Sequence, residues 1–304
     1  MTKPRSHYVD PRNARFYHLT SRCVRRAFLL GQDPVSNRNH HHRKNIFLKR
    51  LKQLARYFTV DIMGYAIMSN HIHLVVRFDP NGAVHWTEEE VAFRWCCVYD
   101  GHGIDSELST KHAPAGPEDF DLNQAIRYHD LLLDPTRVDR CRQALSSLSR
   151  FMQHLKQPFA VWANKQDQTK GHFFESRFYS GALLDESDLM ACMAYVDLNP
   201  VEAKIATSLR ESVDTSIHER LYAERFDPER LEAYLAPLWN EDTEQPKPNL
   251  PYRLHDYAKQ LNLAVSFLTG DQTELPDRLE LWMTRLLNRE RKKRPAHPFF
   301  DYAY

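Results

Sequence analysis

Short runs rich in β-branched and aromatic residues predict the strands of a sheet in the first two thirds of the chain. The runs are residues 15–24, 59–69, 71–78 and 171–184. Side chains alternate between the two faces of a strand, so the even-numbered residues from Ile72 to Phe78 form one apolar face. His71 and His73 point to the other face, about 7 Å apart at their Cα atoms. The pattern therefore predicts a strand that packs a core on one side and presents two imidazoles on the other.

Segments with an apolar residue every three or four positions predict helices. They are residues 43–58, 87–98, 138–166 and 186–199, and residues 205–304 are also helix-prone. The first of these has a narrow apolar stripe, and basic residues occupy much of its remaining surface. Asp185 is a good N-cap for the fourth helix. We expect that helix to end at Asn199, because the residue before a proline disfavours the α conformation.

The order of these elements predicts an α+β fold, with an antiparallel sheet and helices on one face. Residues 15–80 and 141–206 would form this core. Residues 1–14 are polar and contain two prolines, so we expect a mobile N-terminal arm. Residues 81–140 contain many acids, glycines and prolines and are interpreted as a partly helical insertion. Residues 207–304 would form a helical C-terminal extension.

The composition narrows the class of protein. The chain has 304 residues, 42% of them hydrophobic, which excludes global disorder. Its net charge is +1, so a nucleic-acid surface would require local clustering of the 41 lysines and arginines. The five cysteines form no C-x-x-C pair, which is typical of a reducing cytoplasm. The sequence lacks a secretory signal and a long apolar run, so we expect a cytoplasmic protein without membrane association.

Two positions on the helix 186–199 add chemistry to the histidine pair. Tyr195 and Asn199 are four residues apart, so they lie one above the other on the same side of the helix. Tyrosine can act as a nucleophile that forms a covalent intermediate. Imidazole and an amide oxygen are both metal ligands, and such a small set leaves positions open for a phosphate. A bound metal would then polarise a phosphoryl oxygen for attack by the tyrosine.

Three segments together resemble the HUH single-strand transposases, and within them the REP-associated tyrosine transposases. The segments are MSNHIHLV at 68–75, residues 171–179, and YVDLNPV at 195–201. The resemblance implies that His71 and His73 bind the metal from a central strand. It implies that Tyr195 is the nucleophile and that Asn199 supplies the third ligand. It also implies a ferredoxin-like HUH nuclease core, a Mg²⁺ or Mn²⁺ cofactor, and a bacterial protein acting on hairpin-forming DNA such as repetitive extragenic palindromes.

The resulting hypothesis is metal-dependent cleavage and rejoining of single-stranded DNA through a 5′-phosphotyrosine intermediate. One alternative is a domesticated DNA-binding regulator that keeps the fold without using the chemistry. Another is a metal hydrolase built on the H-x-H pair. Hydrolase sites usually gather further His or Asp nearby, and residues 74–78 supply none.

Residues for DNA contacts are less well specified by the sequence. The candidates are Arg43, Lys44, Arg50, His172 and Arg177. A basic helix is often simply a solvated face, and Arg177 could equally pack on a strand. His18, on the first predicted strand, could line a DNA groove but is more simply structural. The sequence leaves open the DNA target and whether the protein is a monomer or a homodimer.

Overall fold

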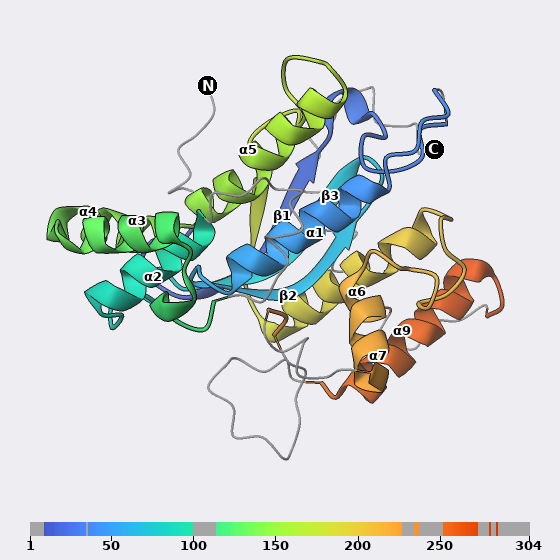
Figure 1. Cartoon of the computed structure of the whole chain (residues 1–304). Coiled ribbons are helices and arrows are strands. Elements are labelled where there is room, and N and C mark those ends of the chain that lie inside the picture. The colour runs from blue at the N-terminus through green and yellow to red at the C-terminus, as the bar shows by residue number, and fades with distance from the viewer. Residues whose placement is uncertain are drawn as a thin grey trace.

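Four antiparallel strands form the centre of the molecule (Figure 1). The computed structural model describes residues 9–34, 36–99, 114–226, 234–236 and 252–272, with residues 280 and 284. The strands are β1 (Arg15–Arg22), β2 (Val60–Ile67), β3 (His71–Phe78) and β4 (Tyr179–Leu183). Their order in the sheet is β2-β3-β1-β4, so β3 and β1 are the inner strands. The predicted α+β class with an antiparallel sheet is confirmed.

The first face of the sheet packs against two helices, as the sequence predicts. The apolar side of β3 joins α1 (His42–Ala55) and α5 (Leu148–Gln166) in one buried cluster. Phe47 of α1 and Phe159 of α5 meet edge to face in that cluster, with ring centroids 5.2 Å apart. Both rings are fully buried, so this layer is the main core of the protein.

The second face is covered as well, by a layer that the sequence analysis did not include. Helix α6 (Glu186–Glu202) packs across β2 and β3, and its Met193 belongs to the same second buried cluster as Val75 of β3. Behind α6 lie α7 (Ser216–Phe226) and α9 (Leu254–Thr269). The helices on one face are therefore α1 and α5, and α6 adds a layer on the face that carries the histidines.

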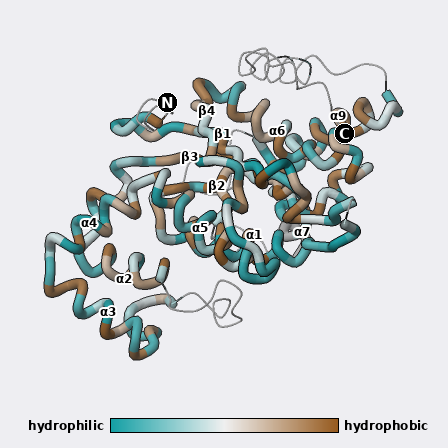
Figure 2. Tube along the Cα trace, turned by 90° about the horizontal axis from the view of Figure 1, so that it is seen from above, coloured by the Kyte–Doolittle hydropathy of each residue, from teal (hydrophilic) through white to brown (hydrophobic). Residues whose placement is uncertain are grey.

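In the described part of residues 81–145, three helices are grouped at one end of the molecule (Figure 2). These are α2 (Glu88–Val98), α3 (Leu122–Leu132) and α4 (Pro135–Leu145), with a 3₁₀ turn at Pro117–Asp119. Thr87 begins α2, where its side chain accepts a hydrogen bond from the Glu90 N–H. The continuous helix predicted over 138–166 is wrong. Ser147 starts α5 as a new N-cap by accepting from the Arg150 N–H, which separates α4 from α5.

Two further boundaries differ from the sequence prediction. Helix α6 continues through Pro200 to Glu202. Pro200 and Val201 are both buried, and Val201 belongs to the second buried cluster, so tertiary packing favours the helical conformation there. A proline removes one helical N–H donor but does not require the helix to end. In 171–184 only β4 is a strand. Before β4, Phe174 forms only an isolated antiparallel bridge with Cys23, which does not extend into a ladder.

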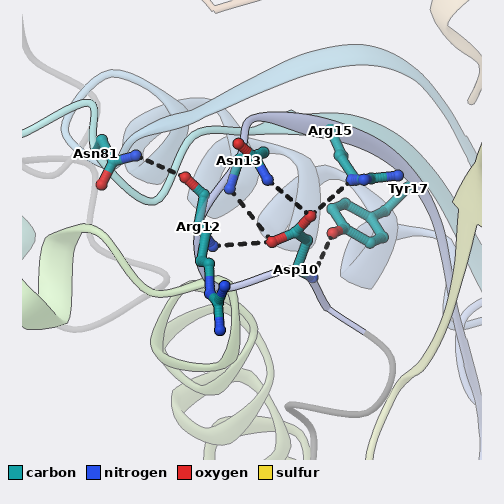
Figure 3. A network of polar contacts seen from close by, with 6 residues as sticks. All are labelled: Asp10, Arg12, Asn13, Arg15, Tyr17 and Asn81. Carbon is teal, nitrogen blue, oxygen red and sulfur yellow. Dashed lines mark hydrogen bonds and ion pairs between the residues drawn. The ribbon is translucent and has the colours of Figure 1, made fainter.

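The segment before β1 makes a set of polar contacts from Val9 onward, while its mobility stays a prediction. Asp10 accepts hydrogen bonds from the backbone N–H groups of Arg12 and Asn13 and pairs with the Arg15 side chain (Figure 3). These bonds, with the Arg12 backbone first, lower the pKa of Asp10 to about 2. The Asp10 N–H donates to the Tyr17 hydroxyl at 2.7 Å. Residues 9–14 thus form a closed turn against the sheet.

Some expectations concern segments beyond these limits. Residues 1–8 of the expected arm, the periodic residues Leu279, Trp282 and Leu286, and the basic run 289–294 all lie outside the described residues. Within the described part of the chain, no helix is both long enough and apolar enough to cross a membrane.

Candidate active site

The two histidines of β3 lie side by side on the face that α6 covers. Their ring centroids are 4.8 Å apart, and the rings meet edge to face. His73 is 6% exposed, and His71 is partly buried. The strand therefore presents the pair as the alternation pattern predicts, but inside the molecule rather than on an open surface.

Helix α6 brings the other two predicted residues to this pair. The Tyr195 ring lies edge-on to His73, with centroids 5.4 Å apart. The Asn199 side chain lies close enough to His71 to raise the pKa of that imidazole. Within residues 189–201, every side chain is buried except that of Tyr195, which is partly exposed. The structure thus unites His71, His73, Tyr195 and Asn199, while their chemical roles stay predictions.

A third histidine, which the sequence analysis interpreted as structural, belongs to the same cluster. His18 of β1 is 7% exposed, and its Nε2 lies 2.9 Å from Nδ1 of His73. The two rings are stacked with centroids 5.1 Å apart, and the Tyr195 ring lies edge-on to His18 at 6.2 Å. The register places Thr20 opposite His73, so His18 is its diagonal neighbour on the same face. The alternation of the first strand contains this signal, but the sequence does not give the register.

His71 is held in its neutral form with a defined tautomer. Its Nδ1 lies 2.6 Å from Oδ1 of Asn70, and because that oxygen only accepts, Nδ1 carries the proton. Burial first, and then the charges of Arg22 and Lys44, lower the pKa of His71 to about 4, although Asn199 acts in the opposite direction. Neutral imidazole is the form that binds metals. With Nδ1 protonated, Nε2 of His71 carries the lone pair that a metal would need.

The donor set fits a divalent cation. In both His71 and His73 the Nδ1 atom lies within hydrogen-bond distance of a neighbour, so Nε2 is the ring nitrogen that would bind a metal. Outer partners of this kind orient metal-binding histidines in other proteins. Asn199 can add an amide oxygen. Among the described residues, no group of three or more His, Cys, Asp or Glu is arranged to hold a metal, so a carboxylate-rich hydrolase centre has no counterpart there.

Three of the predicted DNA-contact residues use their side chains inside the protein, so burial contradicts the prediction for Arg43 and Lys44, while that for the partly exposed Arg50 stays a prediction. Arg43 is fully buried, where it donates to Gln166 and the Leu29 carbonyl and pairs with Asp167. Lys44 is 7% exposed and pairs with Asp214 at 2.7 Å. Arg50 donates to the Val98 carbonyl. Some basic residues of α1 thus join this helix to other segments of the protein, which periodicity alone could not reveal.

Other basic residues surround the histidine end of the sheet. His172 and Arg177 are exposed, so their DNA contacts stay predictions. Arg22 lies opposite His71 in the β1–β3 register and is exposed. The turn after it contains Arg25 and Arg26, both exposed and both left-handed, with φ of 55° and 56°. Left-handed backbone is uncommon for residues other than glycine and is often found at functional sites.

A buried carboxylate ties the site helix to the helices behind it. Asp197, between Tyr195 and Asn199 in sequence, is fully buried. One of its oxygens accepts from the Ser216 hydroxyl at 2.7 Å and from the Ile217 N–H at 2.9 Å. The other accepts from the Tyr257 hydroxyl at 2.8 Å. These bonds fix the rotation of α6, and the sequence pattern offers no signal for them.

Comparison with known proteins gives one structural likeness. No family model matches the chain, and no curated protein matches it. Among solved structures, the chain is similar to that of a REP-associated tyrosine transposase bound to a REP hairpin. The likeness covers 83% of this chain and 100% of that chain, at 12% identity and a TM-score of 0.40. The roles of individual residues must therefore be argued from the geometry of this chain.

Proposed function

We propose that the protein cleaves and rejoins single-stranded DNA by transesterification, with Tyr195 as the nucleophile. The observation that supports this most is the convergence of two distant segments. Helix α6 sets the Tyr195 ring 5.4 Å from the His73 ring, between centroids, and brings Asn199 next to His71. A partly exposed tyrosine beside imidazoles is suited to reach a phosphate held at the same place.

In the proposed step, the Tyr195 oxygen attacks the phosphorus atom and the P–O3′ bond breaks. The products are a 5′-phosphotyrosine and a strand ending in a 3′-hydroxyl, and the proton that the tyrosine loses is balanced by the one that the departing O3′ takes up. The bond energy is retained, so a 3′-hydroxyl can reverse the step without a nucleotide cofactor. Mg²⁺ or Mn²⁺, held by Nε2 of His71, Nε2 of His73 and the Asn199 amide oxygen, would stabilise charge on a phosphoryl oxygen.

The substrate class follows from the site and from the family resemblance. We propose a DNA hairpin with a single-stranded flank, in line with the REP hairpin bound in the similar structure. The tyrosine and histidines lie between α6 and the sheet, where a flexible strand can bend more readily than stiff duplex. Exposed Arg22 and Arg25 replace the buried α1 residues as candidates for phosphate contacts.

The decisive experiment is Tyr195→Phe, which removes only the hydroxyl. We expect no covalent adduct with labelled hairpin DNA on a denaturing gel, while hairpin affinity stays nearly unchanged. Tyr222→Phe is the matched control, because Tyr222 is 60% exposed on α7. An adduct that persists in Tyr195→Phe would show that another residue is the nucleophile. Binding without any adduct in the wild-type protein would favour the regulator.

The metal assignment has its own test. We expect His71→Ala and His73→Ala each to remove adduct formation and to weaken Mn²⁺ binding in calorimetric titration. Removal of one of three protein ligands should lower affinity at least as much as the 10–100-fold effect of an outer partner. Mn²⁺ binding that is unchanged in both variants would contradict the assignment of His71 and His73 as metal ligands.

Substrate preference can be measured by fluorescence anisotropy with hairpin, single-strand and duplex probes. Equal affinity for the three would mean that charge alone drives binding. The slope of log K against log[salt] is about −0.7 to −0.9 per phosphate neutralised. We expect the double variant Arg22→Ala/Arg25→Ala to lose about one such increment for each contact. Arg140→Ala, an exposed arginine of α4, is the control and should leave the slope unchanged.

A further inference from the structure

The contact between His18 and His73 constrains which nitrogen of each imidazole carries the proton. The Nε2 of His18 and the Nδ1 of His73 are 2.9 Å apart, and both side chains are nine-tenths or more buried. One imidazole nitrogen must carry a proton and the other a lone pair for this bond to form. The bond therefore links the tautomers of the two rings.

We infer that His18 is a positioning residue that accepts the proton of His73 Nδ1 and so leaves His73 Nε2 unprotonated for a cation. The inference rests on the proposed metal role of His73. A neutral ring that offers Nε2 as a ligand must carry its proton on Nδ1, so His73 must donate in this bond. His18 must then accept through Nε2 and carry its own proton on Nδ1.

The surroundings of His71 support the same arrangement. Asn70 Oδ1 accepts from His71 Nδ1 at 2.6 Å, which leaves Nε2 of that ring unprotonated. His18 would perform for His73 the task that Asn70 performs for His71. Each ligand then has its own outer acceptor, one from the inner strand β1 and one from the turn before β3.

The ring of His18 also limits the motion of its neighbours. It stacks on His73 with an interplanar angle of 20° and lies edge-on to Tyr195 at 79°. Gly181 of β4 lies opposite His18 and has no side chain that would compete for this space. The histidine therefore contacts both the ligand ring and the ring of the nucleophile, although we expect it to touch neither metal nor substrate.

Two substitutions separate the hydrogen bond from the packing. His18→Phe keeps an aromatic ring but has no acceptor, whereas His18→Gln keeps an acceptor oxygen but no ring. We expect Mn²⁺ affinity to fall about 10–100-fold in His18→Phe, the usual effect of losing an outer partner, and to stay much closer to wild type in His18→Gln. Thr20→Val is the matched control on the same strand face, and it should leave affinity unchanged.

Nitrogen-15 NMR of the metal-free protein gives a readout that does not depend on activity. We expect the wild-type His73 to carry its proton on Nδ1, and His18→Phe to shift it toward the Nε2-protonated form. A wild-type His73 protonated on Nε2 would overturn the inference, as would full Mn²⁺ affinity in a folded His18→Phe. Absence of Mn²⁺ binding by the wild-type protein, with Nδ1 protonated, would instead contradict the proposed metal function alone.

Discussion

The helices at the two ends of the molecule are attached to the sheet core in different ways (Figures 1 and 2). The α2–α4 group continues the main apolar core, and its buried residues include Val91, Leu131 and Val138. Helices α7 and α9 add polar bonds that reach the site helix, above all the three bonds to Asp197. Apolar contact has no direction, whereas a buried hydrogen bond fixes distance and angle. The two groups should therefore affect the site differently.

Helix α7 also forms hydrogen bonds with β2, which extends this contrast. The Ser216 hydroxyl accepts from the Tyr65 N–H at 2.9 Å, and the buried Arg220 donates to the Met63 carbonyl at 2.8 Å. Gly64 permits the close approach, because a Cβ there would lie 3.1 Å from the Ser216 hydroxyl oxygen. Ser216 thus joins a strand of the sheet to Asp197 of α6. The lesson is that an added segment can become part of an active site without supplying a reacting group.

The largest effect should come from Asp197→Ala. It leaves the Ser216 and Tyr257 hydroxyls and the Ile217 N–H without their buried acceptor, so the free energy of unfolding should fall by about 3–5 kcal/mol. Because α6 loses its rotational lock, adduct formation should fall even under conditions where the variant is folded. Denaturant unfolding and the gel assay measure the two effects. Adduct formation at the wild-type rate in the folded variant would show that the bonds to Asp197 do not position the site helix.

Leu131→Ala is the matched change at the other end. Leu131 is 4% exposed on α3, and its truncation should lower the free energy of unfolding by about 2–4 kcal/mol. We expect the Mn²⁺ affinity and the rate of adduct formation to equal those of the wild type at a temperature where both are folded. A large loss of activity would show that the insertion also positions the site.

The pH dependence of the unfolding free energy provides a third test, at His154 of α5. Burial lowers the pKa of His154 to about 4, with help from Arg50 and Arg150. The folded protein therefore prefers neutral His154; this stabilisation is complete above pH 6.5 and is lost as the pH falls from 6.5 toward 4. His154→Phe should make the unfolding free energy less dependent on pH in that window by roughly 1–3 kcal/mol. An unchanged pH profile would contradict the assigned shift.

The smallest effect should come from Tyr257→Phe, which removes one of the three bonds to Asp197. The free energy of unfolding should fall by about 1–2 kcal/mol, and adduct formation should fall less than in Asp197→Ala. Additivity would be informative here. Because the two residues share a bond, the double variant should lose less stability than the sum of the single variants.

The sequence predicted the features that depend on local periodicity. The alternation in 71–78 placed His71 and His73 on one face, and the four-residue spacing placed Tyr195 near Asn199. The sequence could not predict which basic residues are buried, because Arg43 depends on Asp167, which is far away in the chain. His18 was missed because strand register, not composition, makes it a neighbour of His73.

Helix boundaries were predicted less well than helix existence. Proline was given too much weight at position 200, where tertiary packing carries α6 through to Glu202. Serine was given too little weight at position 147, where a local side-chain bond starts a new helix. Tertiary packing and capping thus compete with propensity, and periodicity measures neither of them.

The position of the histidines in the sheet has a consequence for the timescale on which the parts of the site open. His18, His71 and His73 lie on β1 and β3, the two strands with neighbours on both sides. Their backbone amides should therefore exchange with solvent deuterium only when much of the sheet opens. Tyr195 lies on α6, which the bonds of the buried Asp197 hold to α7 and α9, so its amides should be slow to exchange as well. The tyrosine and the imidazoles should therefore open together, when the core of the molecule opens.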